Sequence, residues 1–429
     1  MKKKLKYLLL LMLLCGVSVV SAMLITSLSI DGIGKLGKNT WDVSFDNIVV
    51  SDGSVDGSAS INNRLGISFS ANLMQPGDFY EFKVDVVNNG TIDAMVNKFE
   101  LSDISEYDEL IKYTVSYEDG MEISKKDKLA IMESDTFLIR IEYRKDINSS
   151  NLNNDDIDLS FGFNIDYVQD DGSGVERLSS LVGTLVKGAI SSDNIIFNKA
   201  VTKEENGIYK IDDTYFFRGG VINNNVVIDD TCYYALRTTT LGDLKLLYNG
   251  KYVDGSCRSD DVFIDTIKFD EESNQINHDN SDIRVFLNEW YEENLIKYDK
   301  AIVSGYCNDL SKKDDKYYNF LKFEKGLMDL SCDSTLNDKI ALLSIDDILL
   351  SGYGRSGTNK AFIDASSPYY SMSTYSDSKV IIINEYGAKD TSVVTAELGV
   401  RPVITIKGNT GILDGDGTKD KPYIASLKV

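Results

Sequence analysis

Alternation of apolar and polar residues with a period of two constrains this fold more than any other feature of the chain. The pattern is clearest at residues 80–86, where Tyr80, Phe82, Val84 and Val86 alternate with charged residues. It returns at residues 65–69, 113–117, 137–143 and 159–167, with turns of Gly, Asn and Asp between the segments. Because neighbouring side chains of a strand point to opposite faces, each segment suits a strand with one buried face. We therefore expect an antiparallel β-sandwich over residues 27–168.

The rest of the chain contains helical patterns as well. Residues 283–298 place five apolar side chains on one helical face: Ile283, Phe286, Leu287, Trp290 and Leu295. Ser281 or Asp282 is available as the N-cap of this helix. Residues 344–347 resemble a capping sequence for a brief second helix that ends near Gly352.

Buried strands are expected at residues 340–343, 380–383 and 400–406, and polar loops at residues 274–280 and 311–316. This mixture predicts an α+β domain over residues 194–429. A chain of 429 residues is too long for one ordinary core, which also favours two domains. Because 24 Tyr and 17 Phe accompany only 4 Pro, the composition favours a mainly β protein.

A turn-forming run at residues 170–174 separates the two regions. We expect residues 169–193 to be a linker, with a short helix within residues 178–190.

The first 22 residues have the features of a secretory signal peptide. Four lysines precede an apolar segment at residues 7–20, and Val20-Ser21-Ala22 offers small residues for cleavage after Ala22. The apolar run extends to Ile25, so a retained leader that anchors the protein in the membrane is the alternative. Both interpretations place the protein outside the cytoplasm, either secreted or in the cell envelope.

Four cysteines follow the leader, Cys232, Cys257, Cys307 and Cys332, and an even number in an exported chain indicates disulfides. Three pairings are open. We favour Cys232–Cys257 and Cys307–Cys332 because each closes a short loop within one domain. A zinc site is disfavoured, since no Cys-x-x-Cys spacing occurs and His278 is the only histidine.

The acidic composition excludes one class of partner. The formal charge is −22, and removal of the four leader lysines brings it near −26. Such a polyanion repels nucleic acids and anionic lipid surfaces, so membrane association is expected only through a retained leader. The excess acid is expected mainly to keep the protein soluble.

Calcium is the one cofactor that the sequence suggests. Asp414, Asp416 and Asp420 space oxygen ligands along a Gly-rich turn. The loop is not an EF-hand, because position twelve from Asp414 is Ala425. A plain surface turn is the competing interpretation.

No catalytic pattern stands out, and we predict that the protein is not an enzyme. His278 is the only candidate histidine base, and it lies in a polar segment expected to be a solvated loop. No Gly-x-Ser-x-Gly motif occurs, and 67 acidic residues will form close carboxylate pairs by chance. Tyr369 and Tyr370 could stack on a sugar ring or a partner, although such a pair more often packs in a core.

The segment from Gln75-Pro76-Gly77-Asp78 to Phe82, followed by residues 88–94, resembles exported Firmicute β-sandwich proteins of the camelysin and biofilm-fibre (TasA) type. In that group a Pro-Gly-Asp turn opens a strand and an Asn-Gly-Thr-Ile-Asp-Ala turn closes it. The resemblance covers residues 27–168. It implies a jelly-roll-like sandwich at the cell surface, built into fibres in some members.

The second region is similar to a domain of unknown function found in secreted Firmicute proteins. The matching landmarks are residues 215–219, 287–291, 307–309, 367–373, 399–404 and 415–418. Such domains look distantly like the C-type-lectin fold, which formylglycine-generating enzymes also use. This likeness implies a disulfide-containing, C-type-lectin-like α+β domain.

Together these features predict a surface protein in which a sandwich stalk presents a domain that binds an extracellular glycan or protein. The alternative is a structural subunit of an extracellular fibre or biofilm matrix that self-associates through edge strands. A secreted hydrolase is the third possibility.

Overall fold

The computed structural model describes residues 39–51, 53, 55–144, 159–192, 194–258, 262–332, 334–353 and 361–427. Strands hold 43% of the residues and helices 12%, which confirms a mainly β protein. The predicted signal peptide, residues 1–22, lies outside the described residues. Within those residues, no helix is long and apolar enough to cross a membrane.

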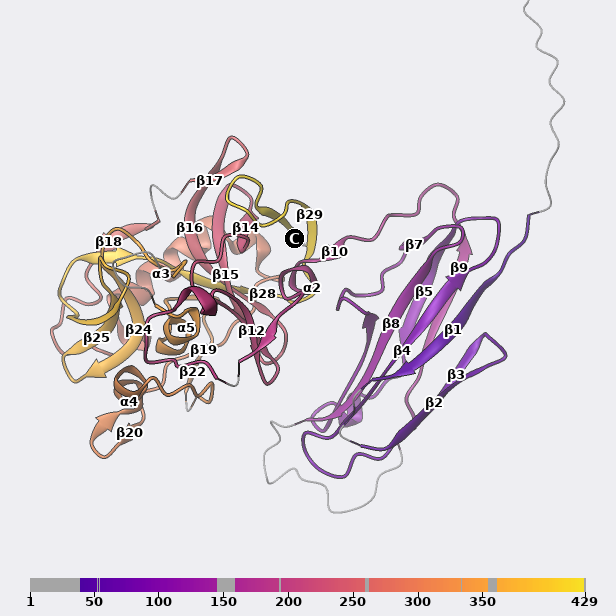
Figure 1. The fold of residues 1–429 in the computed structure, drawn as a ribbon, viewed down its shortest axis with the longest axis horizontal. Coiled ribbons are helices and arrows are strands. Elements are labelled where there is room, and N and C mark those ends of the chain that lie inside the picture. The colour runs from indigo at the N-terminus through magenta and orange to yellow at the C-terminus, as the bar shows by residue number, and fades with distance from the viewer. Residues whose placement is uncertain are drawn as a thin grey trace, which may run out of the picture. The chain divides into compact units, whose positions relative to one another are not determined.

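Residues 43–169 form antiparallel sheets (Figure 1). A four-stranded sheet has the order β1 (Val43–Val50), β4 (Phe79–Asn88), β8 (Ser134–Tyr143) and β6 (Ile111–Tyr117). A second sheet contains β7 (Lys128–Leu129), β5 (Ala94–Leu101) and β9 (Phe163–Gln169), and β2 (Gly57–Asn62) pairs with β3 (Gly66–Ala71). One 3-10 turn, η1, covers Ser105–Tyr107.

The alternation of apolar and polar residues in the sequence corresponds to alternating burial along β4. Tyr80, Phe82, Val84 and Val86 are each at most 2% exposed, whereas the residues between them are only half-buried. These side chains join one apolar cluster with residues of β5, β6, β7 and β8. The buried face of the strand is therefore fixed by its period-two pattern.

Two residues of the segments at 75–82 and 88–94 stabilise turns in this region. Asp78 Oδ2 accepts hydrogen bonds from the backbone N–H groups of Met74 (2.8 Å) and Gln75 (3.0 Å). Asn88 is 1% exposed, and its Nδ2 donates to the carbonyl of Ile92 at 2.9 Å. Both side chains satisfy backbone groups of adjoining loops, so these motif positions have structural roles.

The second region contains two larger sheets. Eight strands of a 12-stranded sheet follow the path β10 (Ser179–Ser180), β29 (Gly411–Asp414), β30 (Tyr423–Ser426), β14 (Asn225–Ile228), β15 (Thr231–Thr238), β13 (Thr214–Arg218), β12 (Gly207–Ile211) and β11 (Ile190–Ser191). The other four strands branch from β15: β16 (Leu244–Val253) pairs with β15, β17 (Ser256–Arg258) and β28 (Val403–Ile406), and β28 pairs with β23 (Ile340–Ala341). A five-stranded sheet has the order β18 (Asp265–Ile267), β27 (Leu398–Val400), β24 (Tyr369–Ser376), β25 (Lys379–Ile383) and β26 (Lys389–Val393). The two ribbons are β19 (Tyr306–Cys307) with β22 (Thr335–Leu336), and β20 (Lys312–Lys313) with β21 (Lys316–Tyr317).

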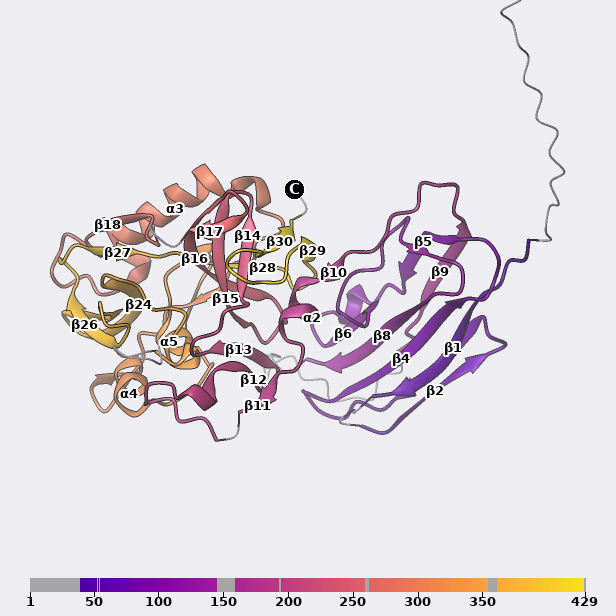
Figure 2. The same cartoon turned by 45° about the horizontal axis from the view of Figure 1, so that its top comes forward.

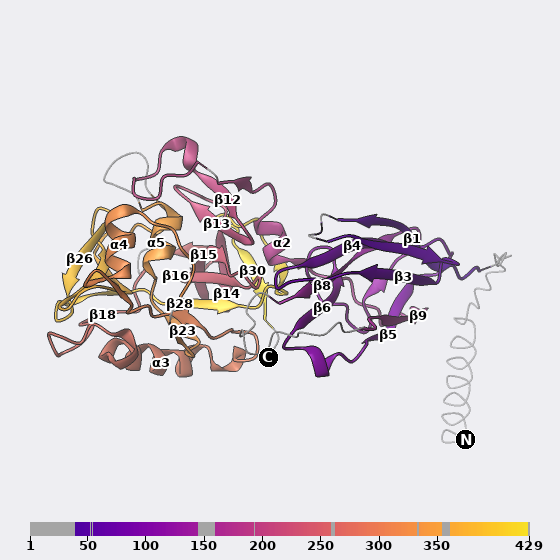
Figure 3. The same cartoon turned by 90° about the horizontal axis from the view of Figure 1, so that it is seen from below.

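Helices cover both faces of the larger sheet around β16. The helices are α2 (Leu181–Leu185), α3 (Asp282–Asn294), α4 (Tyr318–Lys325) and α5 (Ile345–Ser351), with 3-10 turns η3 (Lys203–Glu205), η4 (His278–Asn280) and η5 (Ile296–Tyr298). Figures 2 and 3 show α3 on one side of β16 and α5 on the other. Tyr248 of β16 contacts Trp290 of α3, whereas Lys245 of the same strand pairs with Asp347 of α5.

The expected helix at residues 283–298 is α3 followed by η5. Ile283, Leu287 and Leu295 are buried, and Phe286 and Trp290 pack against the same cluster. The apolar face predicted for this helix is therefore confirmed.

The capping sequence before α5 is also confirmed. Ser344 and Asp347 form a reciprocal capping box, and Gly352 ends the helix at a φ of 73°. Fully buried Arg218 donates a hydrogen bond to the carbonyl of Leu349 at 2.7 Å, near the C-terminus of the helix.

The segment expected as a linker, residues 169–193, contributes strands instead of serving only as a spacer. Its strands β10 and β11 pair with β29 and β12. The helix expected within residues 178–190 is shortened to α2, whose Leu181 and Leu185 join the core of the second region. Burial of these two leucines fixes the segment against that core.

Candidate functional site

The tyrosine pair expected to meet a ligand is part of the core. Tyr369 and Tyr370 are both 0% exposed. The hydroxyl of Tyr369 donates to the carbonyl of Ile363 at 2.6 Å, and that of Tyr370 to the carbonyl of Ala396 at 2.5 Å. Their strand, β24, lies between β27 and β25, and its residues 369–374 are all buried. Neither ring is therefore placed to stack on a ligand.

The aspartates of the candidate calcium loop do not meet in one site. Asp416 Oδ1 accepts hydrogen bonds from the backbone N–H and the hydroxyl of Thr418, at 3.0 and 2.7 Å. Asp414 lies 3.7 Å from the ammonium of Lys421. Across the residues that the structure describes, no group of three or more His, Cys, Asp or Glu side chains is placed to hold a metal ion, and this includes Asp420. Asp416 thus stabilises a turn, the competing interpretation of this loop.

His278 is buried, contrary to the solvated loop expected from the sequence. It lies in η4, its ring is 0% exposed, and the ring centroid is 6.0 Å from that of Phe269. Neither ring nitrogen has a hydrogen-bond partner among the described residues. Burial lowers the pKa of His278 to about 4, so the ring is neutral at neutral pH. This burial is caused by residues from other segments, such as Phe269, which the polar sequence around His278 does not reveal.

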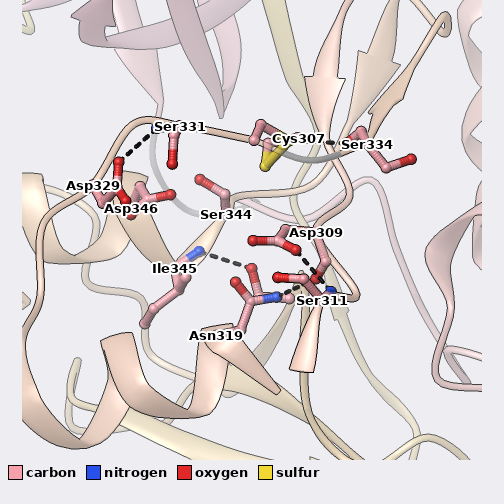
Figure 4. The surroundings of a disulfide bond; sticks show 12 residues. Cys307, Asp309, Ser311, Asn319, Asp329, Ser331, Ser334, Ser344, Ile345 and Asp346 are labelled. Carbon is pink, nitrogen blue, oxygen red and sulfur yellow. Dashed lines mark hydrogen bonds between the residues drawn. A yellow bond between two sulfur atoms is a disulfide. The ribbon is translucent and has the colours of Figure 1, made fainter. Parts of the chain in front are cut away.

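Both disulfides favoured from the sequence are present. Cys232 and Cys257 connect β15 to β17 with a Cα–Cα distance of 5.7 Å. Cys307 and Cys332 are joined at 5.6 Å and close a segment that we call the 307–332 loop. This loop contains the β20–β21 hairpin and α4, and Figure 4 shows the residues at its base.

A buried ion pair connects the 307–332 loop to α5. The ammonium of Lys322, on α4, lies 2.8 Å from Asp346 Oδ2, on α5, and donates to the carbonyl of Asp329 at 2.7 Å. The side chains of Lys322 and Asp346 are 0% and 6% exposed. Asn319 Nδ2 adds a hydrogen bond to the carbonyl of Asp309 at 2.8 Å. The helix is therefore joined to α5 through Lys322 and to the start of its own loop through Asn319.

The neighbouring carboxylate, Asp347, has two cationic partners. Arg237 Nε and Lys245 Nζ lie 2.8 and 2.6 Å from its two oxygens. Burial acts to raise the pKa of Asp347, but attraction to Lys245 and Arg237 outweighs burial and holds the pKa below its usual range.

Asp346 is shifted in the opposite direction. Burial raises the pKa of Asp346 to about 6, against the attraction of Lys322. Its Oδ1 is buried and has no hydrogen-bond partner among the described residues. The two adjacent aspartates therefore differ because one has two cations and the other has one.

A set of aromatic rings with lysines over them is formed by α4, the residue before it and β24, and three of these rings also pack against the core. We define the aromatic–lysine surface as the rings of Tyr317, Phe320, Phe323 and Tyr375 with the side chains of Lys312, Lys316 and Lys389. The four rings are half-buried. The ring of Tyr375 lies with its centroid 5.1 Å from that of Phe320 and 5.2 Å from that of Phe323.

Each lysine of this surface covers a different ring. The ammonium groups of Lys312, Lys316 and Lys389 lie 4.3, 4.5 and 4.6 Å from the ring centroids of Tyr317, Phe320 and Phe323, respectively. These distances are typical of cation–π contacts. Lys389 also donates to the carbonyl of Phe323, and burial lowers its pKa.

Some polar groups of this surface have a carboxylate partner and others do not. Asp377 Oδ1 accepts hydrogen bonds from the hydroxyl of Tyr317 (2.8 Å) and from Lys312 (3.0 Å), and Glu324 accepts one from Tyr375 (3.2 Å). Lys316 has no carboxylate within ion-pair distance in the described ranges of the chain. One exposed ammonium of this surface is therefore not neutralised.

The polar sequence of residues 311–316 predicts only a loop and does not indicate this surface. A usable signal was present, because aromatic residues at 317, 320 and 323 are spaced by three among lysines, between two cysteines. Tyr375 could not have been found in this way, since it comes from a distant strand.

Comparisons of the chain with protein-family models, curated proteins and solved structures find no match. The resemblances to camelysin and TasA-type proteins and to C-type-lectin-like domains thus remain predictions.

Proposed function

We propose that this protein is a secreted or cell-surface recognition protein that binds an extracellular glycan or protein through its second region. The aromatic–lysine surface is the observation that carries this proposal. It combines half-buried aromatic rings with cationic side chains, and aromatic side chains are enriched where proteins bind partners. No other residues singled out from the sequence offer a comparable surface in the described part of the chain, because Tyr369, Tyr370 and His278 are buried.

The contacts that restrain the 307–332 loop favour a binding role for α4 over a purely structural role. A ligand binds more tightly when the groups that meet it are already ordered, because less conformational entropy is lost. The Cys307–Cys332 disulfide and the buried Lys322–Asp346 pair both restrain the 307–332 loop. Two of the rings, Phe320 and Phe323, are consequently presented on a short, fixed helix.

An extracellular location is consistent with two disulfides, which persist in oxidising compartments. The signal-peptide pattern at residues 1–22 supports export by an independent route. Within this proposal, the N-terminal antiparallel region is a stalk that presents the second region.

The test is an array of glycans and matrix proteins probed with the purified, oxidised protein. We expect saturable binding to a defined ligand, and at least tenfold weaker binding for Phe320→Ala. Ile222→Ala is the matched control, because Ile222 is 75% exposed and lies outside the surface. An array without binding, or equal binding by Phe320→Ala, would refute the proposal.

A structural subunit of an extracellular fibre or matrix is the second candidate. The observation that favours it is β1, an outer strand of its sheet that exposes Val49 and Val50 by 50% and 49%. Outer strands with exposed apolar residues can pair with another chain. This candidate predicts concentration-dependent polymers in sedimentation analysis, which Val49→Lys would prevent.

A further inference from the structure

We propose that the aromatic–lysine surface binds a sugar residue that carries one negative charge, of the hexuronate class, within an extracellular glycan. This inference rests on the proposed recognition function and specifies its ligand. It assigns the ring of Phe320 to the apolar face of the sugar and the ammonium of Lys316 to its anionic group.

The rings supply an apolar platform of the size of a sugar. Phe320, Phe323 and Tyr375 lie with centroids 5.1 and 5.2 Å apart, so they form one continuous patch. They are half-buried, and their exposed portions can be covered by the C–H groups of a pyranose without a large rearrangement.

The charges of this surface select an anionic ligand. The ammonium of Lys316 lies over the ring of Phe320, 4.5 Å from its centroid, so a sugar that stacks on this ring displaces the ammonium to the ring edge, where it can meet the anionic group of the sugar. The ammonium has no carboxylate partner in the described ranges, unlike Lys312, which pairs with Asp377 at 3.0 Å. An anionic sugar would complete a charge-assisted hydrogen bond there. A cationic peptide would instead meet three ammonium groups.

The total charge limits how much negative charge the ligand can carry. At a formal charge of −22, the protein repels extended polyanions. Fields between exposed charges are largely screened beyond about 8 Å at physiological ionic strength, so a single charge in contact with Lys316 is governed by its immediate surroundings. A sugar with one anionic group satisfies both conditions.

Asp377 and Tyr317 are placed to contribute polar contacts. Their side chains are hydrogen-bonded to one another at 2.8 Å, and Asp377 is exposed at the edge of the surface. A carboxylate with free lone pairs accepts hydrogen bonds from sugar hydroxyls. The surface thus contains an apolar patch, one exposed cation without a carboxylate partner and one acceptor.

The test is calorimetric titration of the full oxidised protein with three disaccharides of the same linkage: one ending in glucuronate, one in glucose 6-phosphate and one in glucose. We expect the glucuronate probe to bind at least tenfold more tightly than the glucose probe. Comparable binding of the phosphate probe, which carries about −1.5 to −2 at pH 7, would retain an anionic sugar and overturn the limit to one negative charge. Equal binding of the charged and neutral probes would overturn the inference.

Variants separate the two contributions. Lys316→Gln should weaken the glucuronate probe at least tenfold and leave the glucose probe unchanged, whereas Phe320→Ala should weaken both. Lys251→Gln is the matched control, since Lys251 is exposed on β16, away from α4. Unchanged glucuronate binding by Lys316→Gln, with a native circular dichroism spectrum, would overturn the assignment.

The array described under the proposed function distinguishes failure of this inference from failure of that function. Binding to a neutral glycan or a protein on the array, with no preference for the charged disaccharide, would refute the anionic ligand and retain a recognition protein. The absence of any ligand in both experiments would refute both proposals.

Discussion

The ammonium of Lys322 lies 2.8 Å from a carboxylate oxygen of Asp346, and both side chains are buried between α4 and α5. This pair connects the helix that carries the aromatic–lysine surface to a helix of the core. Because Lys322 lies on the same helix as Phe320 and Phe323, we expect the pair to affect binding as well as stability.

Removal of one partner of this pair should lower the unfolding free energy strongly, because the other partner is then left buried without its counter-charge. Lys322→Met leaves a buried carboxylate without its cation, and Asp346→Leu leaves a buried ammonium. We expect each single variant to lose about 3 kcal/mol of unfolding free energy, and the double variant to lose less than the sum of the two. Urea unfolding at pH 7 measures all three values.

The loss in Lys322→Met should depend on pH. Burial already raises the pKa of Asp346 to about 6, and without Lys322 only the weaker attraction of Arg237 opposes the effect of burial. The lone carboxyl therefore takes up a proton readily, so the deficit should shrink at pH 5. Equal deficits at pH 5 and pH 7, or additive losses in the double variant, would contradict the coupling.

His278 should make the protein less stable in acid. Its folded-state pKa is about 4 and its ordinary value is 6.5, so the unfolded state binds the proton more strongly. The contribution of His278 is fully present above pH 6.5 and is lost as pH falls towards 4, by about 3 kcal/mol.

The His278→Phe variant isolates this effect, because it is the only histidine in the chain. Phenylalanine is uncharged and of similar shape, so the difference in unfolding free energy between variant and parent should grow between pH 6.5 and pH 4. A difference that does not change with pH would show that His278 has the same pKa in the folded and unfolded states.

The two disulfides provide a matched comparison, since each joins cysteines 25 residues apart. In the chain-entropy model, loops of equal length give equal stabilisation, about 3 kcal/mol each. The double variants Cys232→Ser/Cys257→Ser and Cys307→Ser/Cys332→Ser should therefore lose similar unfolding free energies in urea.

Ligand binding should separate these two double variants. Only the Cys307–Cys332 bond closes the loop that presents the aromatic–lysine surface. We expect weaker binding in the Cys307→Ser/Cys332→Ser protein at a temperature where both variants are folded. Equal affinities would show that the loop is held by its buried contacts alone.

Gly352→Ala should destabilise the protein more than Gly242→Ala. Both glycines have positive φ, 73° and 88°, so both substitutions strain the backbone. A Cβ at Gly352 would also clash with Val201 and lie 2.9 Å from atoms of Arg218, whereas a Cβ at Gly242 meets nothing within 4 Å. We expect about 1 kcal/mol for Gly242→Ala and clearly more for Gly352→Ala, measured by thermal unfolding. Equal losses would mean that the core around α5 adjusts to the added methyl group.

The sequence by itself determined those features that depend on neighbouring residues. The buried face of β4 follows from alternation at residues 80–86, and the start of α5 follows from Ser344 and Asp347. The disulfide pairing also followed from short sequence separation. Each of these depends on local geometry, which a linear pattern records directly.

Some side chains have similar neighbours in the sequence but differ in exposure, and only the tertiary structure decided which of them reach solvent. Lys316 is exposed and Lys322 is fully buried, although both lie in the same lysine-rich segment. Tyr369 and Tyr370 are both in the core, and residues 369–374 of β24 are all buried. Tyr375 meets Phe320 from a strand about fifty residues away, and His278 is enclosed by residues outside its own loop. Burial is the sum of contacts from distant segments, and for that reason the candidate surface became visible only in the folded chain.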